Sequence, residues 1–166
     1  PEMEIFEAGM IDNALRLGAD IIINTDGDNQ YFGGDIAELV KPIIEKRADL
    51  VIGDRRTGEI GHFGFVKRSL QKYGSRVISS LGGLNIPDVA SGFRAYTRET
   101  ALKISMFTDF DHTAEHVVQA GQDGWGVVVV PIRTNEKTRE SRLFNNIGTF
   151  VLKSGSISLR TYARYK

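Results

Sequence analysis

Two acidic residues, Asp26 and Asp28, are separated by one glycine and followed by the amide side chain of Gln30. They come directly after three isoleucines, residues 21–23, a short β-branched run that is typical of a strand buried on both faces. Side chains at the end of such a strand lie where open α/β sheets bind ligands. Two carboxylates and an amide oxygen can share one Mg²⁺ or Mn²⁺ ion and leave coordination positions for a diphosphate. The alternative is a turn without a ligand, because aspartate and glycine both tolerate turn geometry.

Composition limits which metal sites the chain can build. Its 166 residues, 41% of them hydrophobic, are enough for one domain with a core. The sequence has no cysteine, so any metal ligands must be oxygen or imidazole groups. An EF-hand that starts at Asp26 is excluded, because its required glycine position holds Tyr31 and its glutamate position holds Ala37. The longest apolar stretch, residues 127–132, is too short to span a membrane.

A second motif competes with the aspartate pair. His112, Glu115 and His116 match H-x-x-E-H, the inverted zinc-peptidase signature, with both histidines on one helical face. This alternative needs an acidic third ligand such as Glu136 or Glu140, in a stretch that the sequence predicts to be a basic loop. Short motifs of this kind also arise by chance.

Acidic and basic residues are unevenly distributed along the chain. Residues 1–49 contain eleven acidic and four basic side chains, a net charge of −7, whereas residues 133–166 contain two acidic and eight basic ones, a net charge of +6. A cation-binding end and an anion-binding end suit a protein that handles phosphates with a metal, although solvated helices produce similar runs. No contiguous basic face is interleaved with aromatic residues, which argues against a nucleic-acid partner.

Hydrophobic periodicity predicts helices that alternate with strands, and hence an α/β sheet that is at least partly parallel. The first helix is stopped by Gly18, the second is capped by Asp35 and contains Pro42, and Thr97 caps a short helix. The predicted helices cover residues 2–17, 36–47, 65–81 and 112–121, with a last one from about residue 147; the predicted strands cover residues 20–24, 49–53, 93–96 and 125–132. Because the chain opens inside a helix, we expect a βαβ unit for base and ribose upstream of it.

Several blocks in the chain resemble the family 2 glycosyltransferases of GT-A fold, and among them the dolichol-phosphate mannosyltransferase-like branch. These blocks are FEAG (6–9), ADIIINTDGDNQY (19–31), ADLVIGDRR (48–56), SGFRAYTRE (91–99) and TRESRL (138–143), in the family's order. The resemblance implies a Rossmann-like three-layer α/β/α fold with a mixed, mostly parallel sheet that lacks its N-terminal base-binding strands. It also implies that residues 1–146 form the C-terminal part of the catalytic domain and residues 147–166 a basic helix next to a membrane.

The resemblance assigns roles to the blocks of residues 19–31 and 48–56. Asp26 and Asp28 match the family's DxD pair, and Gln30 falls where relatives place a third metal-shell residue. A cation held by Asp28, together with Arg55, would neutralise the β-phosphate as it leaves the sugar. Arg55 follows a predicted buried strand and can engage phosphate bidentately. The alternative is that Arg55 and Arg56 form an exposed loop pair.

The later blocks supply substrate-binding candidates. Ser91 and Gly92 match a part of the family's sheet under the acceptor and diphosphate, where Gly92 permits close backbone approach. Arg94 either contacts phosphate or braces the loop that holds Asp88. Arg139 and Arg142 match a loop that closes over the phosphates, and the alternative is a solvated loop.

Glu115 matches an acidic residue at a helix start in the family. It is the candidate base if the acceptor is a hydroxyl, and otherwise a structural group, because an ionised lipid phosphate needs no strong base.

The implied reaction is a metal-dependent, inverting transfer of a hexose from a nucleoside-diphosphate sugar, with Mg²⁺ or Mn²⁺ as cofactor. The expected acceptor is a polyprenyl phosphate, dolichyl or undecaprenyl, and a sugar hydroxyl is the second option. We expect the full-length protein at the cytoplasmic face of a membrane, with residues 147–166 in peripheral contact with lipid. The other alternative is a non-catalytic domain that binds a sugar or nucleotide without turnover.

Overall fold

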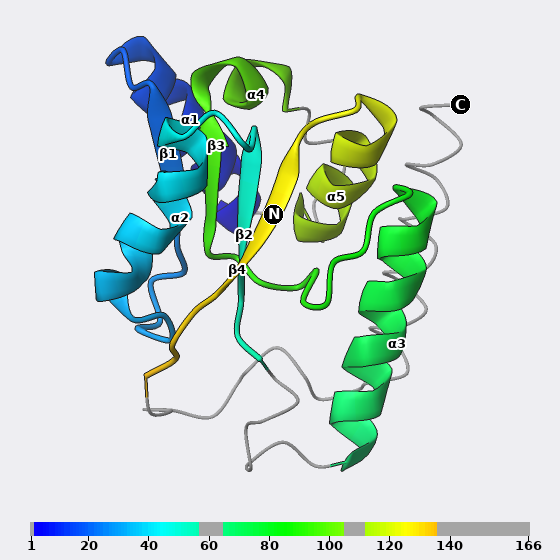
Figure 1. The fold of residues 1–166 in the computed structure, drawn as a ribbon. Coiled ribbons are helices and arrows are strands. Elements are labelled where there is room, and N and C mark those ends of the chain that lie inside the picture. Colours follow the sequence, from blue (N-terminus) through cyan, green and yellow to red (C-terminus); the bar gives the residue numbers. More distant parts are fainter. Residues whose placement is uncertain (1, 57–64, 105–111, 136–166) are drawn as a thin grey trace.

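A four-stranded sheet covered by helices on both faces forms the molecule (Figure 1). The structure is a computed structural model and describes residues 2–56, 65–104 and 112–135. Its elements are α1 (Glu2–Arg16), β1 (Ile21–Asn24), η1 (Gly33–Asp35), α2 (Ile36–Ile44), β2 (Leu50–Asp54), α3 (Phe65–Leu81), β3 (Arg94–Thr97), α4 (Arg98–Lys103), α5 (His112–Gln122) and β4 (Val127–Pro131). None of the described helices combines the length and apolar character that a membrane-spanning helix needs. The predicted helix from residue 147 lies outside the described residues.

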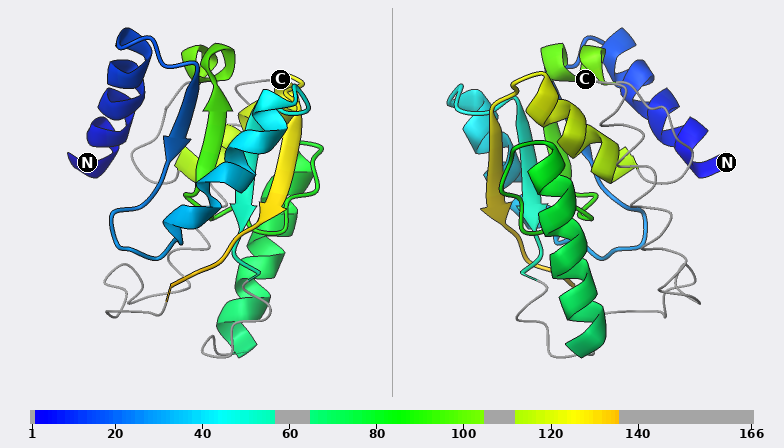
Figure 2. Two further views of the ribbon diagram at one scale, coloured as in Figure 1. Left: turned by 60° about the vertical axis from the view of Figure 1, so that its left-hand side comes forward. Right: turned by 90° about the vertical axis from the view of Figure 1, so that its right-hand side faces the viewer.

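The two faces of the sheet contact separate parts of the core. In β2, Leu50 and Ile52 pack into one cluster with α1, α3 and α5, whereas Val51 packs into the other with α2. The side views show the same division, with α2 on one side of the strands and α3 and α5 on the other (Figure 2). This period-two alternation produces the predicted α/β/α layers. The buried core side chains also alternate in β1, β3 and β4.

The strands are ordered β1-β3-β2-β4, and the sheet is mixed as predicted. β2 pairs in parallel with β4, but β3 pairs antiparallel with both β1 and β2. Among the described strands, β1, β2 and β4 therefore run in the same direction, as expected for a mixed, mostly parallel sheet, and β3 runs against them. After α3 the chain returns to the end of the sheet where β2 finishes. The Gly53 N–H marks this position, since it donates to the carbonyl of Phe93, the residue before β3, at 2.9 Å. β3 starts from that end, so it must run opposite to its neighbours.

Local signals explain most element boundaries. Gly18 ends the α1 region with φ +82°, which only glycine adopts without cost. Thr97 caps α4 as predicted, since its hydroxyl accepts from the Thr100 N–H at 3.2 Å. The prediction that Asp35 caps α2 is wrong. Asp35 precedes the helix but makes no capping hydrogen bond, because its carboxylate accepts from Arg133 instead. A residue 98 positions away in sequence therefore takes the place of the local cap.

Helices α3 and α5 pack with their backbones in contact. A Cβ atom on Gly121 would lie only 1.7 Å from the carbonyl oxygen of Gly82, and one on Gly82 would lie 2.8 Å from the Val117 carbonyl. Side chains at these positions would force the helices apart. This close packing sets α5, and with it His112, Glu115 and His116, inside the helical layer.

Candidate active site

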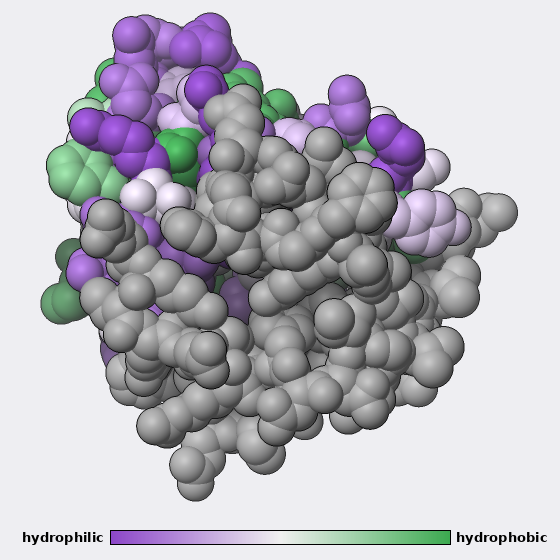
Figure 3. All heavy atoms as spheres, turned by 90° about the horizontal axis from the view of Figure 1, so that it is seen from below, coloured by the Kyte–Doolittle hydropathy of each residue, from purple (hydrophilic) through white to green (hydrophobic). Residues whose placement is uncertain are grey.

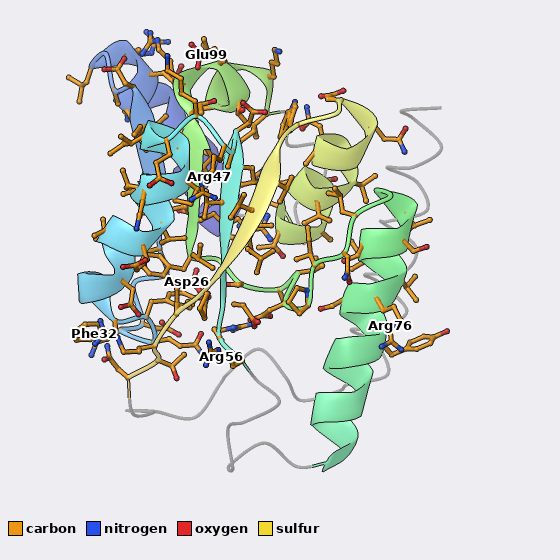
Figure 4. All side chains as sticks on the ribbon, viewed as in Figure 1. Asp26, Phe32, Arg47, Arg56, Arg76 and Glu99 are labelled. Atoms are coloured by element: carbon orange, nitrogen blue, oxygen red, sulfur yellow. The ribbon has the colours of Figure 1, made fainter. Side chains whose placement is uncertain are left out.

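Four chain segments meet at the end of the sheet where β1, β2 and β4 finish and β3 begins. Asn24 and Ile52 both pair with Arg94, the first residue of β3, and Asp54 pairs with Pro131 at the end of β4. The labelled side chains of Asp26 and Arg56 lie at this end of the strands, whereas Glu99 lies at the opposite end (Figure 4). The predicted site residues of the blocks 19–31, 48–56 and 91–99 are thus brought together at one end of the strands, which is called the sheet edge below.

Asp26 lies directly against the backbone of Gly92. A Cβ atom at Gly92 would be 2.8 Å and 3.0 Å from the two carboxylate oxygens of Asp26. The expected close approach at this glycine therefore involves the first aspartate of the predicted metal pair. The amide of Asn24 also donates to the Gly92 carbonyl at 3.4 Å, which links the end of β1 to the start of β3.

Asp28 lies in an exposed turn that it stabilises itself. Its carboxylate oxygen Oδ1 accepts from the Gln30 N–H at 2.9 Å, and the intervening Asn29 has φ +60°. Asparagine tolerates this left-handed conformation better than most residues. The turn reading and the ligand reading are compatible here, because the hydrogen bond engages one carboxylate oxygen and Asp28 remains exposed.

Arg55 forms a buried ion pair with Asp88. Its Nε donates to Asp88 Oδ2 at 2.7 Å and its Nη2 donates to Oδ1 at 2.8 Å, with side-chain exposures of 12% and 1%. Burial alone would lower the pKa of the Arg55 guanidinium, but the hydrogen bonds and charge of Asp88 outweigh burial and raise that pKa. Arg55 is therefore a fixed cation at the sheet edge, not one of an exposed loop pair.

The guanidinium of Arg55 keeps two donors for another group. An arginine has five N–H donors. Among the described residues, three are used: two by Asp88 and one by Gln30, whose Oε1 accepts from Nη1 at 3.3 Å. One N–H remains on each terminal nitrogen. The charge of Asp26 also acts on Arg55, which places this guanidinium near the first aspartate of the pair.

Tyr31 connects the turn of residues 26–30 to the start of β3. Its hydroxyl accepts from the Gly92 N–H at 2.9 Å, and its ring stacks on Phe93 with centroids 5.1 Å apart. Burial raises the pKa of the Tyr31 phenol, while the charge of Arg55 opposes that rise. A neutral, buried tyrosine thus holds together two of the predicted blocks.

The donor set at this edge fits a hard divalent cation. Asp26 and Asp28 are both exposed at the end of one strand, and carboxylate oxygen is the ligand type that Mg²⁺ and Mn²⁺ prefer. Within the part of the chain that the structure describes, no group of three or more His, Cys, Asp or Glu side chains could hold a metal. Among the described residues, such a cation would have the two carboxylates of Asp26 and Asp28, a number that is usual for Mg²⁺ that also binds substrate phosphates.

Ser91 and Arg94 are completely buried. Arg94 donates from Nε to the carbonyl of Ser91 at 2.9 Å and from Nη2 to that of Val89 at 2.6 Å. These bonds brace the loop that holds Asp88, which is the second of the two roles expected for Arg94. Phosphate contact by Arg94 stays an untested prediction.

The H-x-x-E-H residues lie in a different environment. Glu115 and His116 are only 2% and 1% exposed, and His116 Nδ1 hydrogen-bonds the Tyr96 hydroxyl at 3.1 Å. Burial lowers the pKa of His116 well below its ordinary value, and the charges of Arg94 and His112 act in the same direction. The His112 and His116 rings meet edge to face, with centroids 5.7 Å apart. The structure therefore builds this motif into the interior.

Several candidates cannot be placed. Arg139, Arg142 and the proposed third zinc ligands Glu136 and Glu140 lie outside the described residues.

Seen from below, the described part of the surface is largely hydrophilic with smaller hydrophobic areas (Figure 3).

Asp88 and Tyr31 are the site residues that the sequence reasoning gave no role. A signal for Asp88 exists, because an aspartate between the apolar residues Ile86 and Val89 predicts a buried carboxylate that needs a cationic partner. Nothing local identifies that partner as Arg55, which is 33 residues away. Tyr31 could be recognised only as the end of its block.

Comparison with known proteins is consistent with this site. The model of glycosyl transferase family 2 matches residues 14–104, which include Asp26, Asp28, Arg55 and Asp88. The chain is 33% identical over 127 residues to an uncharacterized protein of Methanocaldococcus jannaschii, covering 73% of this chain and 52% of that protein.

Two further relatives have names that state an activity. A UDP-N-acetylglucosamine-dolichyl-phosphate N-acetylglucosaminyltransferase of Methanococcus voltae is 30% identical, covering 73% of this chain and 50% of that protein. A polyprenol monophosphomannose synthase of Mycolicibacterium smegmatis is 27% identical, covering 76% of this chain and 49% of that protein. The chain spans about half the length of these relatives.

Proposed function

We propose a function from the following premise: this chain belongs to glycosyl transferase family 2 and to its dolichol-phosphate mannosyltransferase-like branch. The full protein transfers a hexose to a polyprenyl phosphate. The donor is a nucleoside-diphosphate sugar, and the reaction depends on Mg²⁺ or Mn²⁺. Relatives named for dolichyl phosphate and polyprenol support the lipid acceptor.

One observation carries this proposal: an exposed aspartate pair and a buried, fixed arginine lie at the same edge of the sheet. Asp26 and Asp28 would hold the cation, which when bound supplies positive charge to the donor diphosphate. The two remaining N–H groups of Arg55 would hydrogen-bond phosphate oxygens, where negative charge grows as the sugar leaves. Because Asp88 holds the guanidinium in place, little reorganisation is needed during the reaction.

The chemistry is a single displacement with inversion. An oxygen of the acceptor phosphate attacks the anomeric carbon, the bond from that carbon to the β-phosphate oxygen breaks, and the nucleoside diphosphate leaves with the electron pair. The acceptor oxygen is already ionised near neutral pH, so no side chain has to remove a proton. The burial of Glu115 agrees with this scheme, because a base for a hydroxyl acceptor has to reach that hydroxyl.

We extend the proposal to the residues that the structure does not describe. Arg139 and Arg142 would contact the donor or acceptor phosphates, and residues 147–166 would bring the enzyme to an anionic membrane surface. The cytoplasmic face is the expected side, because nucleotide sugars are the donors.

A transfer assay on the full-length protein tests the function directly. It is incubated with radiolabelled UDP- and GDP-sugars, a polyprenyl phosphate in detergent, and either MnCl₂ or EDTA. We expect lipid-linked sugar with one of the donors, and none with EDTA. Transfer only to sugar hydroxyls would contradict the lipid acceptor, and donor binding without any transfer would favour a non-catalytic domain.

A further inference from the structure

Three consecutive residues, Arg133 to Asn135, lie just beyond β4 and alongside the turn that follows β1. Thr134 forms an isolated antiparallel bridge with Tyr31, and the Phe32 N–H donates to the Arg133 carbonyl at 3.3 Å. The last of the three, Asn135, donates its own backbone N–H to the Gln30 carbonyl at 2.9 Å. The turn that carries Asp28 and Gln30 is thus paired with a segment about a hundred residues later in the chain.

The side chain of Asn135 reaches across this pairing to the turn itself. Its Nδ2 lies 3.0 Å from the Asn29 carbonyl, 3.4 Å from Asn29 Oδ1 and 3.1 Å from the Tyr31 carbonyl. All three are acceptors, so the amide nitrogen must be the group that faces them. Together with its backbone N–H, Asn135 contacts three consecutive residues, 29 to 31.

These contacts fall on the least relaxed part of the turn. Asn29 has a left-handed backbone with φ +60°, a conformation that a surrounding structure has to maintain. The bond from the Gln30 N–H to Asp28 lies within the turn and cannot fix its position against the sheet. Arg55 holds the Gln30 side chain, and Asn135 holds the backbone of the turn.

We propose that Asn135 is a positioning residue for the metal site: it holds residues 29–31 so that Asp28 and Gln30 are presented to the cation. This inference rests on the proposed function. It assigns no metal contact to Asn135, because its nitrogen is engaged by backbone oxygens. Residues that orient metal ligands typically change metal affinity by about 10- to 100-fold when removed.

The test measures binding of Mn²⁺ alone to the full-length protein by isothermal titration calorimetry. Asn135→Leu keeps a similar side-chain volume but removes the donor, and we expect Mn²⁺ affinity to fall by about tenfold. Asn135→Ala serves as a second variant if leucine disturbs folding, with the same expected direction. Arg133→Ala is the matched control: it removes side-chain contacts of the same segment with Asp35 and Phe32, and should leave the affinity within about twofold.

A second readout does not require metal. Hydrogen exchange of the Gln30 and Phe32 amides should be faster in Asn135→Leu than in the wild type without any cation, because the turn loses its outer attachment. Unchanged Mn²⁺ affinity in both Asn135 variants would overturn the inference while leaving the proposed function in place. A wild-type protein that binds no Mn²⁺ would overturn both the inference and the metal dependence.

Discussion

The turn after β1 and the first half of α5 both carry residue types that bind metals, but they lie in opposite surroundings. Asp26 and Asp28 are exposed in a loop at the edge of the sheet, beside the fixed charge of Arg55. Glu115 and His116 are buried against β3 and α3. A cation can reach the exposed loop, whereas burial disfavours the charged form of His116 on the helix. Residue types that can bind a metal therefore form an exposed candidate site in one region and part of the core in the other.

The largest effect is expected at the ion pair of Arg55 and Asp88. Arg55→Leu leaves a buried carboxylate without its partner, which typically costs about 3–5 kcal/mol of unfolding free energy. Transfer activity of the full-length protein should fall by about 100-fold or more, because the phosphate contact is lost. Urea unfolding and the radiolabel assay measure the two effects.

The double variant Arg55→Leu/Asp88→Leu separates these effects. Replacing a buried ion pair by apolar side chains is often neutral, so the double variant should regain most of the stability lost in Arg55→Leu. Activity should not return. Recovery of transfer together with stability would show that Arg55 only supports the fold.

The second prediction concerns acid sensitivity of the helix region. The pKa of His116 is lower in the folded protein than its ordinary value of about 6.5. The unfolded chain therefore binds a proton below pH 6.5 that the folded one does not. The stability contribution of neutral His116 is present above that pH and is lost as pH falls, by at most about 1.4 kcal/mol per pH unit.

Urea unfolding at pH 7.5, 6.0 and 5.0 measures this term as the difference between wild type and His116→Gln. The unfolding free energy of the wild type should fall relative to that of His116→Gln as pH falls. The Mn²⁺ affinity at pH 7.5 should be the same in both proteins. An Mn²⁺ affinity that depends on His116 would break the contrast between the two regions.

Gly92→Ala is expected to act on the aspartate pair with a smaller effect. Its Cβ would lie 2.8 Å from Asp26 Oδ1, so the carboxylate has to move. We expect Mn²⁺ affinity to fall by about tenfold, in the range seen when the groups that orient metal ligands are removed. Gly74→Ala, where nothing lies within 4 Å of the added atom, is the control and should leave affinity unchanged. Equal effects of the two substitutions would contradict the contact between Asp26 and Gly92.

The smallest effect is expected at Arg133, which follows β4 and contacts Asp35 and Phe32. The Arg133 side chain is 68% exposed, although it hydrogen-bonds the buried Asp35 and stacks over Phe32 at 4.1 Å. The arginine side of this pair is exposed, and Asp35 keeps its hydrogen bond from the backbone N–H of residue 133, so Arg133→Ala should lower Tm by no more than about 3 °C. The hydrogen bonds from Arg133 lower the pKa of the Asp35 carboxyl, so this small stabilisation should fade as pH falls through that lowered pKa. A loss that grew toward acid pH would contradict this assignment.

The sequence predicted the elements well because local patterns determine them. Short continuous apolar runs predicted the strands, Gly18 and Thr97 predicted two boundaries, and the aspartates were correctly placed at the end of β1. The direction of β3 could not be predicted in this way, because it depends on where the chain returns after α3. Family membership was also within reach, since the matching blocks are contiguous in sequence.

Pairings between distant residues account for what the sequence left open. Asp88 and Arg55 are 33 positions apart, and Asp35 and Arg133 are 98 apart. Their charges are visible in the sequence, but only the tertiary fold selects the partner. The burial of α5 did leave a signal: Ala114, Val117, Val118 and Ala120 lie on several faces, and a helix that is apolar all round is usually buried.

The central claim is that Asp26 and Asp28 hold a divalent cation that binds a nucleoside diphosphate. The most direct test is calorimetric titration of UDP and GDP into the full-length protein, with and without MnCl₂, for the wild type and Asp28→Asn. We predict that one nucleotide binds the wild type only when Mn²⁺ is present, and that Asp28→Asn abolishes this dependence while its fold, measured by circular dichroism, is retained. Nucleotide binding of equal affinity with and without Mn²⁺, or unchanged Mn²⁺-dependent binding in Asp28→Asn, would contradict the claim.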